Sequence, residues 1–363
     1  MAGTQPRKST RRQPHSDPIA KTRWSVRWRK NVVWVILGSV VLGLIALELV
    51  FQVVLVRLIV PWFENGPPFH VPSSEEDPEA ERIEIETADG LLLRGSLHHH
   101  LDRPPRGVIV YCHEFTGSHW TAMAYCRGLY EAGFDILSFD FRNHGESDVQ
   151  PGYVPLHWLS DHEMTDVHAA IEYAAGRPEL VGLPIGLYGV SRGGAAAMVA
   201  TAQNAAVEAV ASDGGYGTNT LMQFHTPRWA LLVVPAWVYN LIPWWHSLIT
   251  LSLVRWWSQK RRGVQLTPVE RWLPRLGTRE VLLISGRNDN YVTPEVTRKL
   301  HGKIGGNCDQ PWIVPRAKHN RARSVDPIEY DRRLVEFFGA MPGAEEPAHE
   351  IIEIEEATPV VVD

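Results

Sequence analysis

Short runs of consecutive apolar residues alternate with helix-forming stretches along most of this chain, and this alternation limits its possible folds more than any other feature. The apolar runs, which we expect to be strands, lie at residues 108–112, 134–139, 185–188, 207–212, 281–285 and 311–314. Continuous apolar character is typical of strands that are buried on both faces of a parallel sheet. A hairpin of strands 83–87 and 91–97 precedes them, with its turn at Ala88-Asp89-Gly90.

The stretches between these runs predict helices. They lie near residues 120–131, 163–176, 294–302 and 326–339, and another helix follows Ser191. Strands that alternate with helices predict an α/β fold with a doubly wound, mostly parallel sheet and helices on both faces. Because ligands bind such sheets at the carboxyl ends of the strands, functional residues are expected in the loops that follow them.

Length and composition agree with one large folded domain that carries terminal extensions. The 363 residues are 44% hydrophobic and 21% charged, which is ordinary for a folded protein. Residues 1–31 hold nine Lys or Arg against one acid, whereas the last 21 residues hold seven acids and no Lys or Arg. We therefore expect a basic N-terminal tail, 1–31, and an acidic C-terminal tail, 340–363, both solvated. Three cysteines allow at most one disulfide and show no metal-binding spacing.

An apolar segment follows the basic tail directly, which argues against nucleic acid as the partner of that tail. Residues 32–47 contain no charge, and the apolar character continues to Val60. At about 1.5 Å per residue, residues 32–54 span roughly 34 Å, enough for the hydrocarbon core of a bilayer. We predict a single transmembrane anchor at 32–60, followed by a Pro- and Glu-rich linker at 61–82. The basic residues before it predict a cytoplasmic N-terminus and an extracytoplasmic catalytic domain.

Two other interpretations of the apolar segment stay open. A cleaved signal peptide would have a shorter apolar region and an A-x-A cleavage site, and no such site follows here. The segment is also long enough to form a buried core helix.

A long insertion interrupts the alternation of strands and helices. Residues 214–276 occupy a place where one connecting helix would suffice, and they are rich in Trp, Leu, Ile and Val. Insertions of this length beside a strand-end site are usually functional, so we predict a cap. Pro235 and Pro243 argue for an amphipathic cap over a second membrane span. The basic run Lys260-Arg261-Arg262 suits either acidic lipid headgroups or a solvated face.

The pentapeptide Gly189-Val190-Ser191-Arg192-Gly193 stands between an expected strand and an expected helix. A serine at such a turn is held in a strained conformation with its hydroxyl at the edge of the sheet. It also lies at a helix N-terminus, where free N–H groups favour negative charge. The pattern therefore predicts Ser191 as a nucleophile. A glycine-rich turn with an incidental serine is the alternative.

A serine nucleophile requires a base, an acid that orients the base, and hydrogen-bond donors for the oxyanion. His319 follows the last strand and is the candidate base; Asp289 follows strand 281–285 and is the candidate acid. Asp213, at the end of strand 207–212, is the alternative acid. The chain order Ser, Asp, His is that of the hydrolase elbow type. We expect the oxyanion donors to be the backbone N–H groups of Arg192 and Phe115.

Residues 83–339 resemble the α/β-hydrolase superfamily, in the branch that includes serine aminopeptidase-like and dienelactone hydrolase-like enzymes. The resemblance is carried by the segments 113–118, 140–147, 189–193, 286–289 and 319–320. It implies that the residue at position 115 supplies an oxyanion N–H, although Glu114 stands where the family usually has glycine. It also implies a structural role for the 140–147 loop. For the cap, it gives no information about which substrate the protein binds.

The motifs together predict a membrane-anchored serine hydrolase that cleaves a lipophilic ester or thioester with Ser191, His319 and Asp289, and that associates with membrane lipid. Its chemistry requires neither a metal ion nor an organic cofactor. A serine peptidase is the first alternative, with Glu114 as a carboxylate that could bind a free α-amine. A non-catalytic, membrane-tethered binding protein is the second.

The adjacent His98, His99 and His100 are interpreted as part of a solvated loop, because neighbouring side chains of an extended chain point to opposite sides.

Overall fold

The chain forms two compact units. The computed structural model describes residues 18–66, 70–72, 75–305 and 308–344, and its contacts separate Met1–Leu58 from Ile59–Asp363. The two units are considered separately below.

The first unit consists of most of one long helix, α1 (Pro18–Glu64). Its segment Asn31–Glu64 has a mean hydropathy of 2.5 and is long and apolar enough to cross a membrane. Among the residues that the structure describes, no second helix meets these conditions. The predicted boundaries need correction, because the helix already includes residues 18–31 of the expected basic tail. Residues 1–17 of that tail lie outside the described residues.

The last turn of α1 belongs to the second unit and corrects the start of the predicted linker, 61–82. The helix continues through Pro61 to Glu64, and Phe63 is 1% exposed. The Phe63 ring stacks on Trp158 with centroids 4.9 Å apart, and Trp158 Nε1 donates to the Phe63 carbonyl at 2.7 Å. This packing explains why the helix extends past a proline that would otherwise favour its end.

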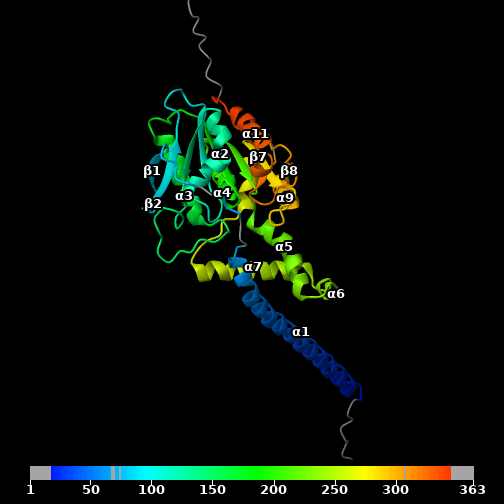
Figure 1. Cartoon of the computed structure of the whole chain (residues 1–363). Coiled ribbons are helices and arrows are strands. Elements are labelled where there is room, and N and C mark those ends of the chain that lie inside the picture. The colour runs from blue at the N-terminus through cyan, green and yellow to red at the C-terminus, as the bar shows by residue number, and fades with distance from the viewer. Residues whose placement is uncertain (1–17, 67–69, 73–74, 306–307, 345–363) are drawn as a thin grey trace, which may run out of the picture. The chain divides into compact units, whose positions relative to one another are not determined.

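The second unit is built on an eight-stranded sheet, as predicted (Figure 1). Its strands are β1 (Glu81–Glu86), β2 (Leu92–His98), β3 (Gly107–Cys112), β4 (Phe134–Phe139), β5 (Ile185–Val190), β6 (Val207–Asp213), β7 (Glu280–Gly286) and β8 (Trp312–Val314). Their spatial order is β1-β2-β4-β3-β5-β6-β7-β8. The β1–β2 and β2–β4 pairs are antiparallel and all other pairs are parallel. The mostly parallel sheet is confirmed.

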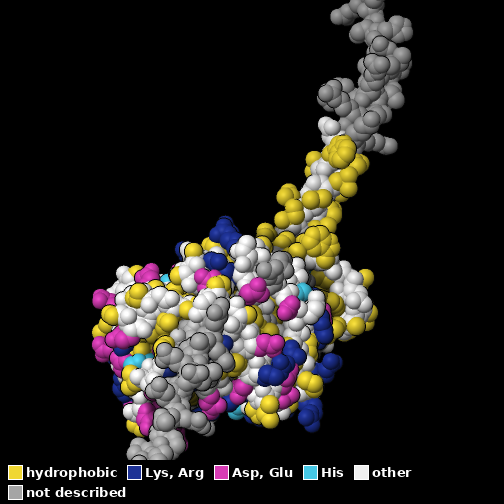
Figure 2. Space-filling view, turned by 90° about the horizontal axis from the view of Figure 1, so that it is seen from above, with side chains coloured by type: hydrophobic (Ala, Val, Ile, Leu, Met, Phe, Trp, Pro, Cys, Tyr) yellow, Lys and Arg dark blue, Asp and Glu magenta, His cyan; other side chains and the backbone are white. Residues whose placement is uncertain are grey.

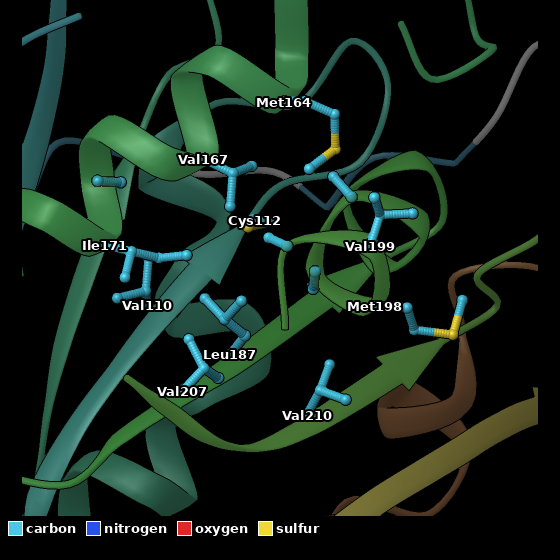
Figure 3. Packing of buried hydrophobic residues seen from close by; sticks show 14 of the residues in the cluster. Val110, Cys112, Met164, Val167, Ile171, Leu187, Met198, Val199, Val207 and Val210 are labelled. Carbon is cyan, nitrogen blue, oxygen red and sulfur yellow. The ribbon is translucent and has the colours of Figure 1, made fainter. Parts of the chain in front are cut away.

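Alternate residues of the central strands supply two hydrophobic cores, one on each face of the sheet. On one face, Val110 and Leu187 pack against α3 (Asp161–Gly176) and α4 (Arg192–Gln203), as Figure 3 shows. On the other face, Ile109 and Tyr188 pack against α2 (Ala122–Glu131) and α11 (Pro327–Gly339). Because both faces are covered, the two innermost strands, β3 and β5, carry no charged residue and are almost continuously apolar. The doubly wound arrangement is therefore confirmed.

The helices of the two faces keep the expected order with small shifts at their ends. They are α2 (Ala122–Glu131), α3 (Asp161–Gly176), α4 (Arg192–Gln203), α8 (Val269–Trp272), α9 (Pro294–Ile304), α10 (Ala322–Val325) and α11 (Pro327–Gly339), with short 3₁₀ turns at His119–Thr121 and Leu273–Leu276. Helix α3 begins two residues before the predicted start, because Ser160 and Glu163 form a reciprocal capping box there.

The insertion forms α5 (Thr218–Val233), α6 (Ala236–Tyr239) and α7 (Trp244–Arg262), which extend away from the sheet in Figure 1. Pro235 and Pro243 stand at the N-caps of α6 and α7, so the prolines divide the segment as expected. The predicted range 214–276 is too wide, because Val269 and Leu276 of its last part are buried in the main core.

Two smaller expectations are also corrected. The acidic tail was expected from residue 340, but Met341 and Ala344 are buried in the second core; residues 345–363 lie outside the described residues. His98 is the last residue of β2 and is 6% exposed, so it is not part of a solvated loop. All three cysteines are free.

Candidate active site

The candidate nucleophile lies on a sharp turn between β5 and α4. Ser191 has φ 55° and ψ −118°, a conformation that is strained for a residue with a side chain. The turn needs small neighbours: a Cβ atom on Gly193 would lie 2.1 Å from the Cys112 carbonyl oxygen, and one on Gly189 would lie 2.3 Å from the Gly193 oxygen. The Ser191 N–H donates to the Asp213 carbonyl at 2.8 Å, which ties the turn to β6.

Three residues that are far apart in the sequence meet at this turn. Ser191 Oγ lies 2.9 Å from His319 Nε2, and His319 Nδ1 lies 2.6 Å from Asp289 Oδ2. The other carboxylate oxygen, Asp289 Oδ1, accepts from the backbone N–H groups of Tyr291 at 2.8 Å and Val292 at 2.9 Å. The carboxylate is therefore fixed by its own loop while it faces the imidazole. This geometry suits proton transfer from a serine hydroxyl.

Glycine at position 214 gives the imidazole its space. Gly214 follows β6 with φ +64°, and a Cβ atom there would lie 3.2 Å from His319 Cε1. The residue thus combines a left-handed backbone with a close approach to the imidazole.

Asp213, the alternative acid, has different contacts. It is 2% exposed, and its carboxylate accepts a hydrogen bond from the Tyr330 hydroxyl at 2.7 Å. Burial raises the pKa of Asp213 to about 6. The Tyr330 hydroxyl also bonds to Tyr188 in the adjacent core. These contacts give Asp213 a structural environment between β6 and α11, whereas Asp289 bonds directly to the imidazole.

The expected oxyanion donors lie after two neighbouring strands, β3 and β5. The Arg192 N–H is the first of helix α4, and such groups have no acceptor within their helix. Phe115 follows β3, and the Arg192 guanidinium lies over its ring at 5.1 Å. Within the described part of the chain, neither backbone N–H donates a hydrogen bond. Both N–H groups therefore remain available for an anionic oxygen, and their role as oxyanion donors stays a prediction.

The side chain of Arg192 forms a buried ion pair that was not predicted from the sequence. Arg192 is 0% exposed; its Nη1 lies 3.4 Å from Glu163 Oε1 and donates to the Leu156 carbonyl at 3.0 Å. Burial would raise the pKa of Glu163, but the Arg192 charge and the Ser160 and Tyr153 hydroxyls outweigh it and lower that pKa. The pair links the elbow helix to α3.

Aromatic side chains pack beside the imidazole of His319. Tyr291 lies 5.6 Å from the His319 ring, and it contacts Tyr216 at 5.8 Å and His157 at 6.3 Å between ring centroids. Burial lowers the pKa of His157 to about 3, with a smaller contribution from Arg192, so its ring is neutral. We call Tyr216, Tyr291 and His157 the aromatic shell. Ser191 itself has 0% exposed area.

Two described residues that follow α1, Gly66 and His70, lie close to residues of the site. A Cβ atom on Gly66 would lie 3.1 Å from His157 Nδ1, and Asn320 Nδ2 donates to the His70 carbonyl at 3.1 Å. Asn320 is the residue that follows His319. The predicted linker therefore contributes contacts at the site, which its Pro- and Glu-rich composition did not indicate.

Glu114 lies next to Phe115 but faces the core. The residue is 0% exposed, and hydroxyls of Tyr111, Thr121 and Tyr125 donate to its carboxylate at 3.3 to 3.4 Å. Burial raises the pKa of Glu114 to about 7, although these hydroxyls lower it in part. A carboxylate enclosed in this way does not present itself to a substrate amine.

The raised pKa of Glu114 predicts how stability changes with pH. Between the usual carboxyl pKa of 4.5 and about 7, the folded state holds this proton and the unfolded state has lost it. Stability therefore falls as pH rises through this range, by on the order of 3 kcal/mol. Glu114→Gln should flatten the pH dependence of the urea unfolding midpoint between about pH 5 and pH 8, whereas the exposed Glu131→Gln should not. Parallel curves for Glu114→Gln and wild type would contradict the assignment.

The three adjacent histidines each meet a different carboxylate. His98 lies 3.3 Å from Asp77 and His100 lies 3.0 Å from Asp135, while His99 is 3.7 Å from Glu81. In the ranges that the structure describes, no group of three or more His, Cys, Asp or Glu residues is arranged to hold a metal ion.

Comparison with known proteins agrees with this fold. Residues 103–271 match a family model described as serine aminopeptidase, S33. Protein bem46 of Schizosaccharomyces pombe is 25% identical over 290 residues, which cover 78% of this chain and 86% of bem46. The thiohydrolase aneE of Aspergillus aculeatus is 29% identical over 124 residues, 34% of this chain and 37% of aneE. An esterase of Pyrococcus furiosus has a similar structure, with a TM-score of 0.55 and 23% identity over 75% of this chain and 95% of the esterase chain.

Proposed function

This chain belongs to the α/β-hydrolase superfamily, and from that premise we propose that it is a membrane-anchored serine hydrolase of lipophilic carboxylic esters or thioesters. The observation that carries the proposal is the continuous hydrogen-bonded series from Ser191 through His319 to Asp289, at 2.9 Å and 2.6 Å. The N–H of Arg192, the residue after this serine, is available as an oxyanion donor and adds support.

The proposed reaction has two halves. Ser191 Oγ attacks the substrate carbonyl carbon while His319 Nε2 takes the hydroxyl proton, and the carbonyl oxygen becomes an oxyanion held by the N–H groups of Phe115 and Arg192. His319 then gives its proton to the departing alcohol or thiol, which leaves an acyl-enzyme. Water attacks this acyl group with His319 again as base, and the acid product leaves as Ser191 recovers its proton. Asp289 stabilises the imidazolium throughout.

Covalent labelling tests the catalytic role. We expect a fluorophosphonate probe to label the full-length protein, and peptide mapping by mass spectrometry to locate the label on Ser191. A folded wild-type protein that takes up no label would favour the non-catalytic binding role. A label on another serine would refute the proposed nucleophile.

The cap supports a lipophilic acyl group, and the partial likeness to a thiohydrolase supports thioesters beside oxygen esters. Helices α5 and α7 carry Trp229, Trp244 and Trp256 among aliphatic residues. We therefore expect kcat/KM for p-nitrophenyl esters to rise with acyl length, because each buried methylene contributes about 0.8 kcal/mol, up to roughly fourfold per carbon. Initial rates on acetyl, butyryl, octanoyl and lauroyl esters below their solubility limits measure this. A preference for the acetyl ester would contradict the lipophilic assignment.

The peptidase alternative is less well supported. An enzyme that trims N-terminal residues needs a carboxylate facing the free α-amine, and Glu114 is enclosed by three hydroxyls in the core. Side-by-side rates on an aminoacyl anilide and an acyl ester test this directly, and we expect the ester to be preferred.

The apolar helix supports the membrane anchor. Leu42, Leu44 and Leu47 are each at least 60% exposed, and Figure 2 shows hydrophobic side chains covering the described part of α1. So many exposed apolar side chains on one helix suit a lipid surrounding. A cleaved signal is less compatible, because cleavage after Phe63 would remove a ring that is 1% exposed and stacked on Trp158.

Retention of the protein in membranes after alkaline extraction tests the anchor.

The positive charges of residues 1–31 support a cytoplasmic N-terminus, with the catalytic domain on the opposite side. In intact cells, a membrane-impermeant maleimide should therefore react with a cysteine at Ile328, which is 83% exposed, and not with one at Ser9. The reverse pattern would reverse the orientation.

A further inference from the structure

The described part of the second unit concentrates its exposed apolar side chains in one segment. Helices α5, α6 and α7 and the turns between them include Leu231, Leu232, Trp237, Leu241, Trp244 and Trp256. Leu232, Leu241 and Trp244 are 77%, 73% and 76% exposed. We call these six residues the cap surface. Elsewhere in this unit the exposed large apolar side chains are scattered, such as Leu101 and Ile328. A concentration of this kind marks an interaction site.

The charge of the cap identifies the kind of partner. Residues 214–269 contain no Asp or Glu, whereas they contain five Lys or Arg, at positions 228, 255, 260, 261 and 262. Exposed Trp and Leu together with basic residues and no acid are typical of a helix that lies in the interface of an anionic bilayer. Tryptophan is favoured at that depth because its ring is apolar and its N–H is polar.

The cap is also joined to the end of the apolar helix. Glu64, the last residue of α1, is 6% exposed, and its carboxylate accepts from Ser258 at 2.8 Å and from Arg262 Nε at 2.8 Å. Arg261 pairs with the same carboxylate. Glu64 is also the last residue of the candidate membrane span, Asn31–Glu64. The carboxyl end of α7 is thus bonded to the end of that span. Two of the three basic residues at 260–262 therefore have a partner within the protein.

We propose that the cap surface lies in the interfacial region of an anionic bilayer. The proposal rests on the proposed function for its membrane anchor, and it adds a second, peripheral membrane contact that brings the cap to the lipid. Helix α5 connects that contact to the site: its His225 stacks on Tyr291 at 5.6 Å, and Tyr291 contacts His319. The substrate class that fits is an acyl ester held in the membrane, which would reach Ser191 along α5.

A fluorescent label at the cap surface tests this contact in the full-length chain. In a Cys308→Ser background, with Cys112 and Cys126 buried, an NBD label is attached at Leu241→Cys or, as matched control, at Ile328→Cys, which is 83% exposed. The protein is reconstituted into vesicles of phosphatidylcholine with or without phosphatidylglycerol. We expect spin-labelled lipid to quench the label at 241 severalfold more than that at 328, iodide to quench the one at 328 more, and phosphatidylglycerol to increase the difference.

Three outcomes would overturn the proposal. Equal iodide quenching at both positions would show that the cap surface faces water. Protection at 241 from iodide and from spin-labelled lipid alike would show that protein, such as a second copy of this chain, covers it. Equal lipid quenching with and without phosphatidylglycerol would remove the anionic requirement. Failure of the anchor would instead appear as loss of protein from the vesicles, and failure of the catalytic proposal as absence of fluorophosphonate labelling.

Discussion

Replacing Ser191 with alanine is expected to lower kcat for the best ester substrate by about 10⁶-fold and to abolish fluorophosphonate labelling. The loss should be this large because the Ser191 oxygen is the atom that forms the acyl-enzyme and the group that lies 2.9 Å from His319 Nε2. Stopped assays at high enzyme concentration measure the remaining rate. Retention of more than about 1% of wild-type activity would place the nucleophile elsewhere.

The two candidate acids provide the matched control for this result. Asp289→Asn keeps the shape of the side chain but removes the charge that faces His319 Nδ1 at 2.6 Å, so kcat should fall by about 10⁴-fold. Asp213→Asn makes the same chemical change where the carboxylate accepts from Tyr330 at 2.7 Å. Its kcat should stay within about tenfold of wild type, because orientation of the imidazole is retained. A larger loss of kcat for Asp213→Asn than for Asp289→Asn would show that Asp213 is the acid that orients His319.

Removing Glu163 is expected to cause a large loss of stability. Glu163→Ala leaves the Arg192 guanidinium, which is 0% exposed, without its carboxylate, and it also removes the acceptor of Ser160 in the cap of α3. Breaking a buried ion pair from one side costs about 3–5 kcal/mol. The apparent Tm, measured by near-ultraviolet circular dichroism, should fall by about 10 °C.

Glu172→Ala on the exposed side of the same helix is the control and should change the free energy of unfolding by about 0.5 kcal/mol or less. The pH dependence offers a second check. The pKa of Glu163 in the folded state is lowered from 4.5. Its contribution to the free energy of unfolding is therefore present above the pKa of the unfolded state and is lost as pH falls through the pKa of the folded state. The difference in free energy of unfolding between wild type and Glu163→Ala should therefore become smaller at acidic pH. A constant difference at all pH values would show that the charge of Glu163 is unimportant.

The sheet could be predicted from sequence because its strands are buried on both faces and bounded by turns. Val108–Cys112 illustrates this: Val110 packs on one face and Ile109 on the other, so every position is apolar and the run is unmistakable. The elbow was equally clear, since the glycines on either side of Ser191 meet backbone atoms at distances that exclude a Cβ atom. Local requirements of this kind restrict which residue types can occupy a position, so they can be recognised in the sequence.

Other parts of the site could not be predicted, because they depend on pairs that only the fold brings together. Arg192 and Glu163 carry no local pattern that distinguishes them from solvated charges, and nothing in the sequence connects Phe63 with Trp158, 95 residues away. The same reason explains the misplaced start of the linker at residue 61. Helix ends respond to tertiary contacts more than to propensity, and Pro61 on its own indicated the opposite.

The complete burial of Ser191 has a kinetic consequence. No reagent can contact the hydroxyl until the side chains around it change their positions, so we expect covalent labelling to be gated, with an opening step ahead of the chemistry. The observed first-order rate constant should then level off as reagent concentration increases, and the plateau would equal the opening rate whatever the leaving group of the reagent.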